Sequence, residues 1–330
     1  MQPKDTIETM RSLIDSKIPT FLWGAPGIGK SSIIKQLARE KEIECIDLRL
    51  SLMDPTDLKG IPFYERDSHS ALWAPPSFLP REGEGILFLD ELNSAAPAVQ
   101  ASAYQLILDR RVGEYELPEG WAIVAAGNRE GDRGVVYRLP SPLANRFVHI
   151  EMEVSADDWR TWAIGWGIDP RVIAYIAFNN SALFGFDPLK NERSFPTPRS
   201  WEAVHTILKS PLPKKLWLEA ISGAVGRDAA VDFLGFVQVM DKLPDIEAIL
   251  RGENNEVSED LSTLYALSSA LVSRLLLAPS DEAVSNVLRY SLHLKNEFAV
   301  MIVQDLQRQG VVMEHLDAFG EWVEAYAYLL

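Results

Sequence analysis

Residues 24–31 read Gly24-Ala25-Pro26-Gly27-Ile28-Gly29-Lys30-Ser31 and fit the pattern Gly-x-x-x-x-Gly-Lys-[Ser/Thr] in full. An apolar run at residues 20–23 precedes this stretch, and a helical pattern over residues 30–39 follows it. Glycines let the backbone curl around phosphate groups and present N–H groups to them at the positive end of the helix. We therefore predict a nucleotide-binding loop that includes these residues and Ser32, with Lys30 at the β- and γ-phosphates and Ser31 on Mg²⁺. The alternative is a glycine turn without a ligand.

Short apolar runs alternate with helical patterns through residues 1–150. The pattern predicts strands at residues 20–23, 43–48, 85–89, 121–126 and 148–151, and helices at 30–39 and 97–109. Ser94 is expected to cap the second helix, and Pro97 suits its first turn because no N–H is required there. Strands that are apolar throughout are typical of a parallel sheet buried on both faces. The expected fold class is α/β, with the parallel sheet of a P-loop nucleotide-binding domain.

Beyond Glu151 the pattern becomes helical. A hydroxyl followed by two acids at residues 155–158 predicts a helix start, and further helices are expected at 200–209, 261–277, 281–294 and 296–309. Trp159, Trp162 and Trp166 have the spacing of one helix face, which we interpret as the buried face of a lid helix, with a ligand-stacking role as the alternative. We therefore expect an α/β domain over residues 1–153 with a hairpin insertion near 60–84, an all-α lid domain over 154–245, and an acidic helical C-terminal extension over 246–330.

Composition limits the function. The net charge of −15 disfavours nucleic-acid binding, which usually requires a basic face. Residues 241–330 carry 15 acidic and 6 basic side chains, which favours solubility or, alternatively, a docking surface for a basic or metal-bearing partner protein. We expect no membrane span, because no apolar run reaches about 18 residues, and no structural zinc. Cys45 stands alone and the N-terminus does not read as a secretory signal, so the cytoplasm is the expected location.

Polar residues follow two of the predicted strands. The apolar run at residues 86–89 ends in Asp90 and Glu91. A buried strand would deliver Asp90 to the metal, and Glu91 would then lie where a carboxylate polarises an attacking water. Asn128 follows the strand at 121–126 and could hold that water beside Glu91. The alternatives are that the two acids cap a helix and that Gly127-Asn128 forms a turn.

These residues, in this order, resemble the AAA+ ATPases, and within them the MoxR-like branch that also includes the CbbQ/NirQ-type activators. The resemblance extends over residues 15–245 and is strongest at the nucleotide-binding loop, the Asp90-Glu91 pair and Asn128. It identifies Asn128 with the residue known as sensor 1. Asn93 matches the asparagine of the Asp-Glu-x-Asn pattern of that branch.

The resemblance also assigns roles to arginines. Residues 143–147, Leu-Ala-Asn-Arg-Phe, look like the segment that carries the arginine finger, so Arg146 would act in the site of a neighbouring subunit. Arg138 and Arg133 are alternatives for that role, and a surface ion pair is the alternative for Arg146. Pro198-Arg199 resembles the sensor 2 motif, which would place Arg199 on the γ-phosphate. A guanidinium there would stabilise the charge that spreads over the γ-phosphoryl oxygens.

The MoxR-like branch carries an insertion before the strand that ends in the acidic pair. Here Phe63-Tyr64 and residues 71–73 could form the two arms of a hairpin around residues 67–70. In the family such an insertion points toward the pore of a ring. Our hypothesis is that Phe63, Tyr64 or Trp73 grips a partner protein, and the alternative is that these aromatic residues pack the hairpin onto the body.

The resemblance implies a Mg-ATP-dependent ATPase that forms a homo-oligomer, expected to be a hexameric ring. Hydrolysis would be coupled to remodelling or activation of a partner protein or metalloprotein complex, possible adaptors being proteins with a von Willebrand factor A domain. Two alternatives remain. A nucleic-acid translocase or loader is disfavoured by the net charge, and a nucleotide-switched scaffold would not need Glu91.

Overall fold

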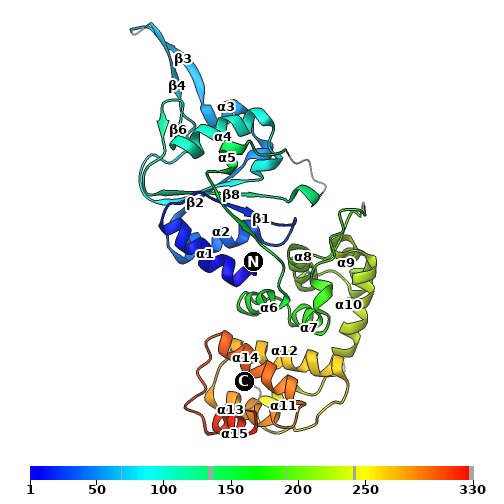
Figure 1. Ribbon diagram of the computed structural model, residues 1–330. Helices are drawn as coiled ribbons and strands as arrows, with labels where there is room; N and C mark the ends of the chain where they lie inside the picture. Colours follow the sequence, from blue (N-terminus) through cyan, green and yellow to red (C-terminus); the bar gives the residue numbers. More distant parts are fainter. Residues whose placement is uncertain (68, 133–136, 191, 241–242, 327–330) are drawn as a thin grey trace. The chain divides into compact units, whose positions relative to one another are not determined.

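The computed structural model describes residues 1–67, 69–132, 137–190, 192–240 and 243–326 (Figure 1). The chain divides into two compact units, Met1–Val154 and Ser155–Leu330. Arg133 and Ser68 lie outside the described residues. Within those residues, the structure contains no helix that is both long and apolar enough to cross a membrane.

The first unit is built on a parallel sheet of five strands in the order β2-β5-β8-β1-β9. Its strands are β1 (Thr20–Trp23), β2 (Glu44–Arg49), β5 (Gly85–Asp90), β8 (Trp121–Gly127) and β9 (Val148–Glu151). All five expected strands are present to within a residue at either end. Every residue of β5 and β8 is buried, because helices cover both faces of the sheet (Figure 1).

Helices α1 (Pro3–Asp15) and α2 (Lys30–Glu40) lie on one face of the sheet, and α4 (Pro97–Asp109) lies on the other (Figure 1). On the α4 side, alternate residues of neighbouring strands, such as Leu87 and Ile123, share one hydrophobic core with Leu106 of α4. Two short helices, α3 (Pro55–Lys59) and α5 (Ser141–Ala144), complete the unit. The parallel sheet confirms the α/β fold class expected from the sequence.

The N-cap expected for α4 is wrong. Ala96 occupies the cap position, and Ser94 ends a short 3₁₀ turn, Leu92–Ser94, without capping α4. The 3₁₀ turn connects the end of β5 to α4 and includes Ser94, so the helix begins only at Pro97. Pro97 is in the first turn of α4, as expected.

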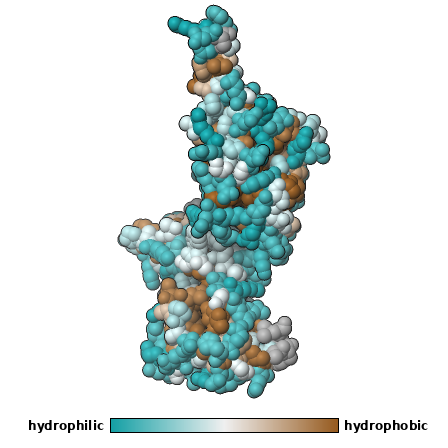
Figure 2. All heavy atoms as spheres, turned by 90° about the vertical axis from the view of Figure 1, so that its left-hand side faces the viewer, coloured by the Kyte–Doolittle hydropathy of each residue, from teal (hydrophilic) through white to brown (hydrophobic). Residues whose placement is uncertain are grey.

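A two-stranded antiparallel hairpin, β3 (Ile61–Glu65) and β4 (Ser70–Ala74), projects from the first unit (Figure 1). Its apolar side chains are largely uncovered, with Ile61 70% and Tyr64 62% exposed. Figure 2 shows apolar residues along the stem of this hairpin beneath a hydrophilic tip. Trp73 is half-buried near the base, where its Cβ approaches Gly113 in the turn of a second small hairpin, β6 (Arg111–Val112) and β7 (Tyr115–Glu116).

The regular elements of the second unit are all helices within the described residues. Its helices are α6 (Ala156–Gly165), α7 (Pro170–Phe178), α8 (Pro198–Lys209), α9 (Trp217–Val225), α10 (Arg227–Met240), α11 (Ile246–Leu250), α12 (Leu261–Leu277), α13 (Asp281–Ser291), α14 (Asn296–Arg308) and α15 (Asp317–Tyr326). As expected, Ser155 caps α6, where its hydroxyl accepts a hydrogen bond from the Asp158 N–H.

Helices from either side of residue 245 pack together in the second unit. Helix α12 packs against α7, and a buried ion pair joins Arg160 of α6 to Asp305 of α14, with 2.8 Å between Nη2 and Oδ1. The division of this unit into a lid and an extension stays a prediction.

The expectation of a buried tryptophan face is wrong at Trp166. Trp159 is buried, but Trp166 is 61% exposed because α6 ends at Gly165 and the periodic pattern extends past the end of the helix.

Candidate nucleotide site

The glycine-rich loop has the backbone that its sequence predicts. Gly29, the residue before α2, has φ of 101°, in the region that glycine tolerates and other residues avoid. Gly24 allows a close approach, because a Cβ there would lie 2.4 Å from Cδ1 of Ile28. The loop therefore joins the carboxyl end of β1 directly to the N-terminus of α2, the end of a helix that attracts anions.

Lys30 is the first residue of α2, directly after this loop, and is only 8% exposed. Its ammonium donates hydrogen bonds to the carbonyl oxygens of Gly24 and Ala25, at 2.6 and 3.0 Å, and to Oδ1 of Asn128 at 3.0 Å. The contact with Asn128 links two sequence-predicted site residues that come from different strand ends. The loop residues Pro26, Gly27 and Ile28 complete the turn, and Ser32 is exposed on α2.

Ser31 and Asp90 also meet at this edge of the sheet. The Ser31 hydroxyl donates to Oδ2 of Asp90 at 2.8 Å. Burial raises the pKa of Asp90, an effect that the hydrogen bond from Ser31 opposes in part. A hydroxyl and a carboxylate in contact are suitable oxygen ligands for Mg²⁺, which keeps several waters and binds substrate phosphates rather than a complete protein cage. The two side chains therefore fit a Mg²⁺ ion that accompanies a nucleotide.

Glu91 follows Asp90 in a left-handed backbone conformation, with φ of 57° and ψ of 32°. This conformation is uncommon for a residue with a side chain and is often found at functional sites. The Glu91 side chain is exposed, and its carboxylate accepts a hydrogen bond from the Ser51 hydroxyl. Ser51 follows β2, and sequence reasoning missed it because no motif marks its position.

Asn128 and Asn93 are connected through the backbone. The Asn93 side-chain amide donates to the Asn128 carbonyl oxygen at 2.7 Å, and the Asn93 carbonyl accepts a hydrogen bond from the Tyr137 N–H, also at 2.7 Å. Asn93 is 1% exposed, whereas Asn128 is half-buried. The residues from β5 and β8 are thus held as one polar cluster beside the loop.

Arg146 follows α5 and lies on the surface of the first unit. Within the described residues, its guanidinium makes no ion pair or hydrogen bond. The same segment is tied to the end of β1 through His149, which accepts a hydrogen bond from the Trp23 indole at 2.8 Å and contacts the Ala144 carbonyl oxygen with its other ring nitrogen. Because Nδ1 accepts from the indole, Nε2 carries the proton that it donates to Ala144.

The other predicted arginines have different surroundings. Arg138 is exposed in the first unit, and Arg133 lies outside the described residues. Arg199 is exposed in the first turn of α8, in the second unit. The structure therefore brings together the loop, Asp90, Glu91 and Asn128, while the roles of Arg146 and Arg199 stay predictions.

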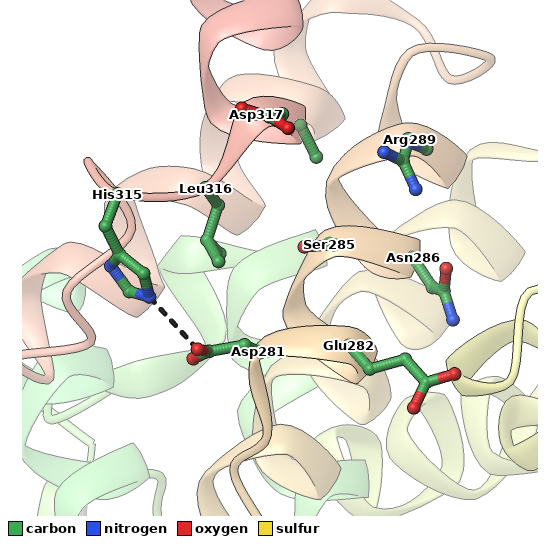
Figure 3. Close-up of a pocket in the computed structure, with 9 residues that line it drawn as sticks. Asp281, Glu282, Ser285, Asn286, Arg289, His315, Leu316 and Asp317 are labelled. Atoms are coloured by element: carbon green, nitrogen blue, oxygen red, sulfur yellow. Dashed lines mark ion pairs between the residues drawn. The ribbon is translucent and has the colours of Figure 1, made fainter.

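A separate hollow of about 440 Å³ lies in the second unit, between α13 and the segment that leads into α15 (Figure 3). Its lining includes Asp281, Glu282 and Asp317, and His315 contacts Asp281 at 3.2 Å. In the described part of the chain no group of three or more His, Cys, Asp and Glu residues is arranged to hold a metal. None of the sequence-predicted site residues lines this hollow.

A known family model matches part of the first unit. Residues 20–149 match the model of the ATPase family associated with various cellular activities, AAA. Among curated proteins, MoxR of Methylorubrum extorquens is 27% identical over 144 residues, which are 42% of this chain and 41% of MoxR. The match thus spans about two fifths of that relative.

Two solved structures have a low overall similarity to the chain. The RuvB Holliday junction branch migration motor of Thermotoga maritima has a TM-score of 0.38 and 17% identity, covering 85% of this chain and 86% of that chain. NtrX of Brucella abortus in complex with ADP has a TM-score of 0.42 and 13% identity, covering 98% of this chain and 68% of that chain.

Proposed function

We propose that this chain, whose residues 20–149 form an AAA domain of the MoxR type, hydrolyses Mg-ATP in a ring of identical subunits and uses the energy to remodel a partner protein. The observation that carries the proposal is the cluster at the carboxyl edge of the sheet. There Lys30 contacts Asn128, Ser31 contacts Asp90, and Glu91 lies next to that pair.

Each side chain has a defined task in this proposal. The N–H groups at the start of α2 bind the phosphates, and Lys30 neutralises charge on the β- and γ-phosphates. Ser31 and Asp90 hold the Mg²⁺ ion, which when bound neutralises charge that develops on the phosphoryl oxygens. Glu91 accepts a proton from the attacking water, and Asn128 orients that water from the neighbouring strand.

Glu91 argues for hydrolysis over a nucleotide-switched scaffold. Nucleotide binding needs the loop and the metal ligands, but it does not need an exposed carboxylate one residue beyond Asp90. The left-handed backbone at Glu91 has a conformational cost of about 1 kcal/mol or more. That cost is understandable if the carboxylate must face a reacting water.

Arg146 supports a shared site. An exposed guanidinium without a partner in the described part of its own chain is suited to insert into the site of an adjacent copy. We propose that Arg146 stabilises the transferring phosphoryl group in trans, and that Arg199 contacts the γ-phosphate from the second unit. The assignment of Arg146 implies that hydrolysis requires assembly, which we propose to be a hexameric ring.

The β3–β4 hairpin is the proposed contact with the partner protein. Ile61, Phe63 and Tyr64 are exposed and apolar on a ribbon that projects from the nucleotide-binding unit. Trp73 is half-buried near the base, so we assign gripping to Phe63 and Tyr64 in preference to Trp73. An adaptor with a von Willebrand factor A domain, a metalloprotein complex as the target and a cytoplasmic location remain expectations from the family resemblance.

Nucleic acid is the less favoured target. RuvB is described as a Holliday junction branch migration motor, but the net charge of −15 of the present chain opposes binding to a phosphate backbone. Stimulation of ATP hydrolysis by duplex DNA that weakens steeply with added salt would reverse this order.

Steady-state hydrolysis of Mg-ATP by the purified wild type and by Glu91→Gln tests the proposed activity. We expect the wild type to turn over ATP and Glu91→Gln to lose activity by about 100-fold or more, while its affinity for ATP, measured by calorimetry, stays within about threefold. Gln keeps the size of the side chain but cannot accept the proton. Equal turnover in the two proteins would refute the role of Glu91, and an inactive wild type that binds ATP tightly would favour the scaffold.

A further inference from the structure

Asn93 is a buried amide between the two strand ends that carry the proposed chemistry. It lies two residues beyond Glu91 in the short turn after β5 and is 1% exposed. Its Nδ2 donates to the Asn128 carbonyl oxygen at 2.7 Å. The same residue therefore shares a turn with the proposed base and holds the backbone of the residue that contacts Lys30.

The packing around Asn93 leaves little freedom. A Cβ on Gly127 would lie 2.1 Å from Oδ1 of Asn93, so this position of β8 can hold only glycine while the Asn93 amide keeps its place. Among the residues that the structure describes, Oδ1 has no hydrogen-bond partner, although it is buried. An unpaired buried acceptor costs about 1–3 kcal/mol. Stability alone therefore does not explain an amide at this position.

The contacts of Asn93 continue on both sides. Asn128 Oδ1 accepts a hydrogen bond from Lys30 at 3.0 Å, and the Asn93 carbonyl accepts one from the Tyr137 N–H at 2.7 Å. A continuous polar chain thus runs from the nucleotide loop through Asn128 and Asn93 to Tyr137.

We infer that Asn93 is a positioning residue for hydrolysis. It fixes Asn128 relative to Glu91, so that the Asn128 and Glu91 side chains contact the same attacking water. The inference rests on the proposed ATPase function and adds a residue to its machinery. Asn93 reaches Asn128 through the backbone, so its loss leaves the phosphate-binding groups of the loop in place. The consequence falls on the rate of the chemical step and not on nucleotide affinity, because small displacements of a reacting group slow reactions strongly.

Asn93→Asp is the sharpest test, since it keeps the volume and removes the N–H donor. We expect kcat to fall about 10–100-fold, while the dissociation constant for ADP, measured by calorimetry, changes less than about twofold. Gln100→Glu is the matched control. Gln100 is also a buried amide that donates to a nearby carbonyl, that of Ala95 at 3.1 Å, and Asn128 is not its partner. The kcat of this control should stay within about twofold of the wild type.

A double-variant cycle distinguishes positioning from a general structural role. If Asn93 acts through Asn128, Asn93→Asp combined with Asn128→Ala should be no slower than Asn128→Ala alone. Asn93→Ala, which also removes the unpaired acceptor, replaces Asn93→Asp in both measurements if the latter does not fold.

Three results would overturn the inference. They are unchanged kcat in a folded Asn93 variant, losses that multiply with Asn128→Ala, and an equal loss in Gln100→Glu. Failure of the proposed function is distinguishable from these, because the wild type itself would then hydrolyse no ATP.

Discussion

The carboxyl edge of the sheet and the β3–β4 hairpin belong to the same unit, yet they distribute polarity in opposite ways. At the edge, Lys30, Asp90 and Asn93 are buried polar residues. On the hairpin, Ile61 and Tyr64 are apolar or aromatic residues with well over half of their surface exposed. Each region departs from the usual partition of polar groups outside and apolar groups inside.

The two regions therefore fit the different classes of ligand proposed for them. Buried polar groups are costly unless they are paired, and at the edge Lys30 and Asp90 are paired with neighbouring protein groups that a bound nucleotide and its Mg²⁺ ion would replace in part under the proposed function. Exposed apolar surface on a two-stranded ribbon, an element of marginal stability by itself, fits contact with another protein. Substitutions should therefore affect hydrolysis at the edge and coupling to a partner at the hairpin.

Replacing the hairpin aromatics tests this separation. Phe63→Ser combined with Tyr64→Ser should leave basal ATP hydrolysis unchanged, because the hairpin side chains lie outside the nucleotide cluster. If the hairpin grips extended polypeptide, unfolded casein should stimulate the wild type, and the double variant should need about tenfold more casein for the same stimulation.

Leu277→Ser is the control for loss of exposed apolar surface, since Leu277 is 80% exposed in the second unit. It should respond to casein like the wild type. If the wild type and the hairpin variant respond identically to casein, the hairpin does not bind the partner protein.

Asp90→Asn tests the effect of a buried carboxylate on stability at the carboxyl edge of the sheet. Burial raises the pKa of Asp90 in the folded protein, so the folded state binds an extra proton between the ordinary Asp pKa and the raised value. The wild type therefore loses stability as pH rises through that window, and the loss is complete above it. Without nucleotide or Mg²⁺, Asp90→Asn should unfold about 2–4 °C above the wild type at neutral pH.

The advantage of Asp90→Asn should vanish below the ordinary Asp pKa of 3.8, where both states are protonated in the wild type. Thermal unfolding of the first unit against pH measures this, with Glu91→Gln as an exposed neighbouring control. A variant less stable than the wild type at neutral pH would mean that the hydrogen bond from Ser31 outweighs the cost of burial.

Much of the first unit follows from its sequence because its signals are local. The run at residues 85–89 is apolar throughout and ends in two acids, so both its burial and its position at the carboxyl edge are predictable. Strand order is different. The placement of β8 between β5 and β1 depends on contacts across the sheet, which no local pattern specifies.

Site residues outside a motif could not be predicted for the same reason. Ser51 reaches Glu91 because β2 pairs with β5 and brings the two strand ends together. The link from Asn93 to Asn128 likewise depends on the pairing of β5 with β8. The error at Trp166 has another cause, because helical periodicity indicates a face but does not say where the helix ends.

The most direct test of a shared hydrolytic site is to mix two inactive variants. Glu91→Gln lacks the base but keeps Arg146, and Arg146→Ala lacks the guanidinium but keeps Glu91. Glu91→Gln alone should lose activity by about 100-fold or more, and Arg146→Ala alone by about 10³-fold. ATP hydrolysis by the equimolar mixture, and by the wild type over a range of protein concentrations, should be measured. With a shared site, mixing should restore a substantial fraction of wild-type turnover, and specific activity should rise with protein concentration. No recovery on mixing, together with turnover independent of concentration, would show that each chain hydrolyses ATP alone and would contradict the shared site.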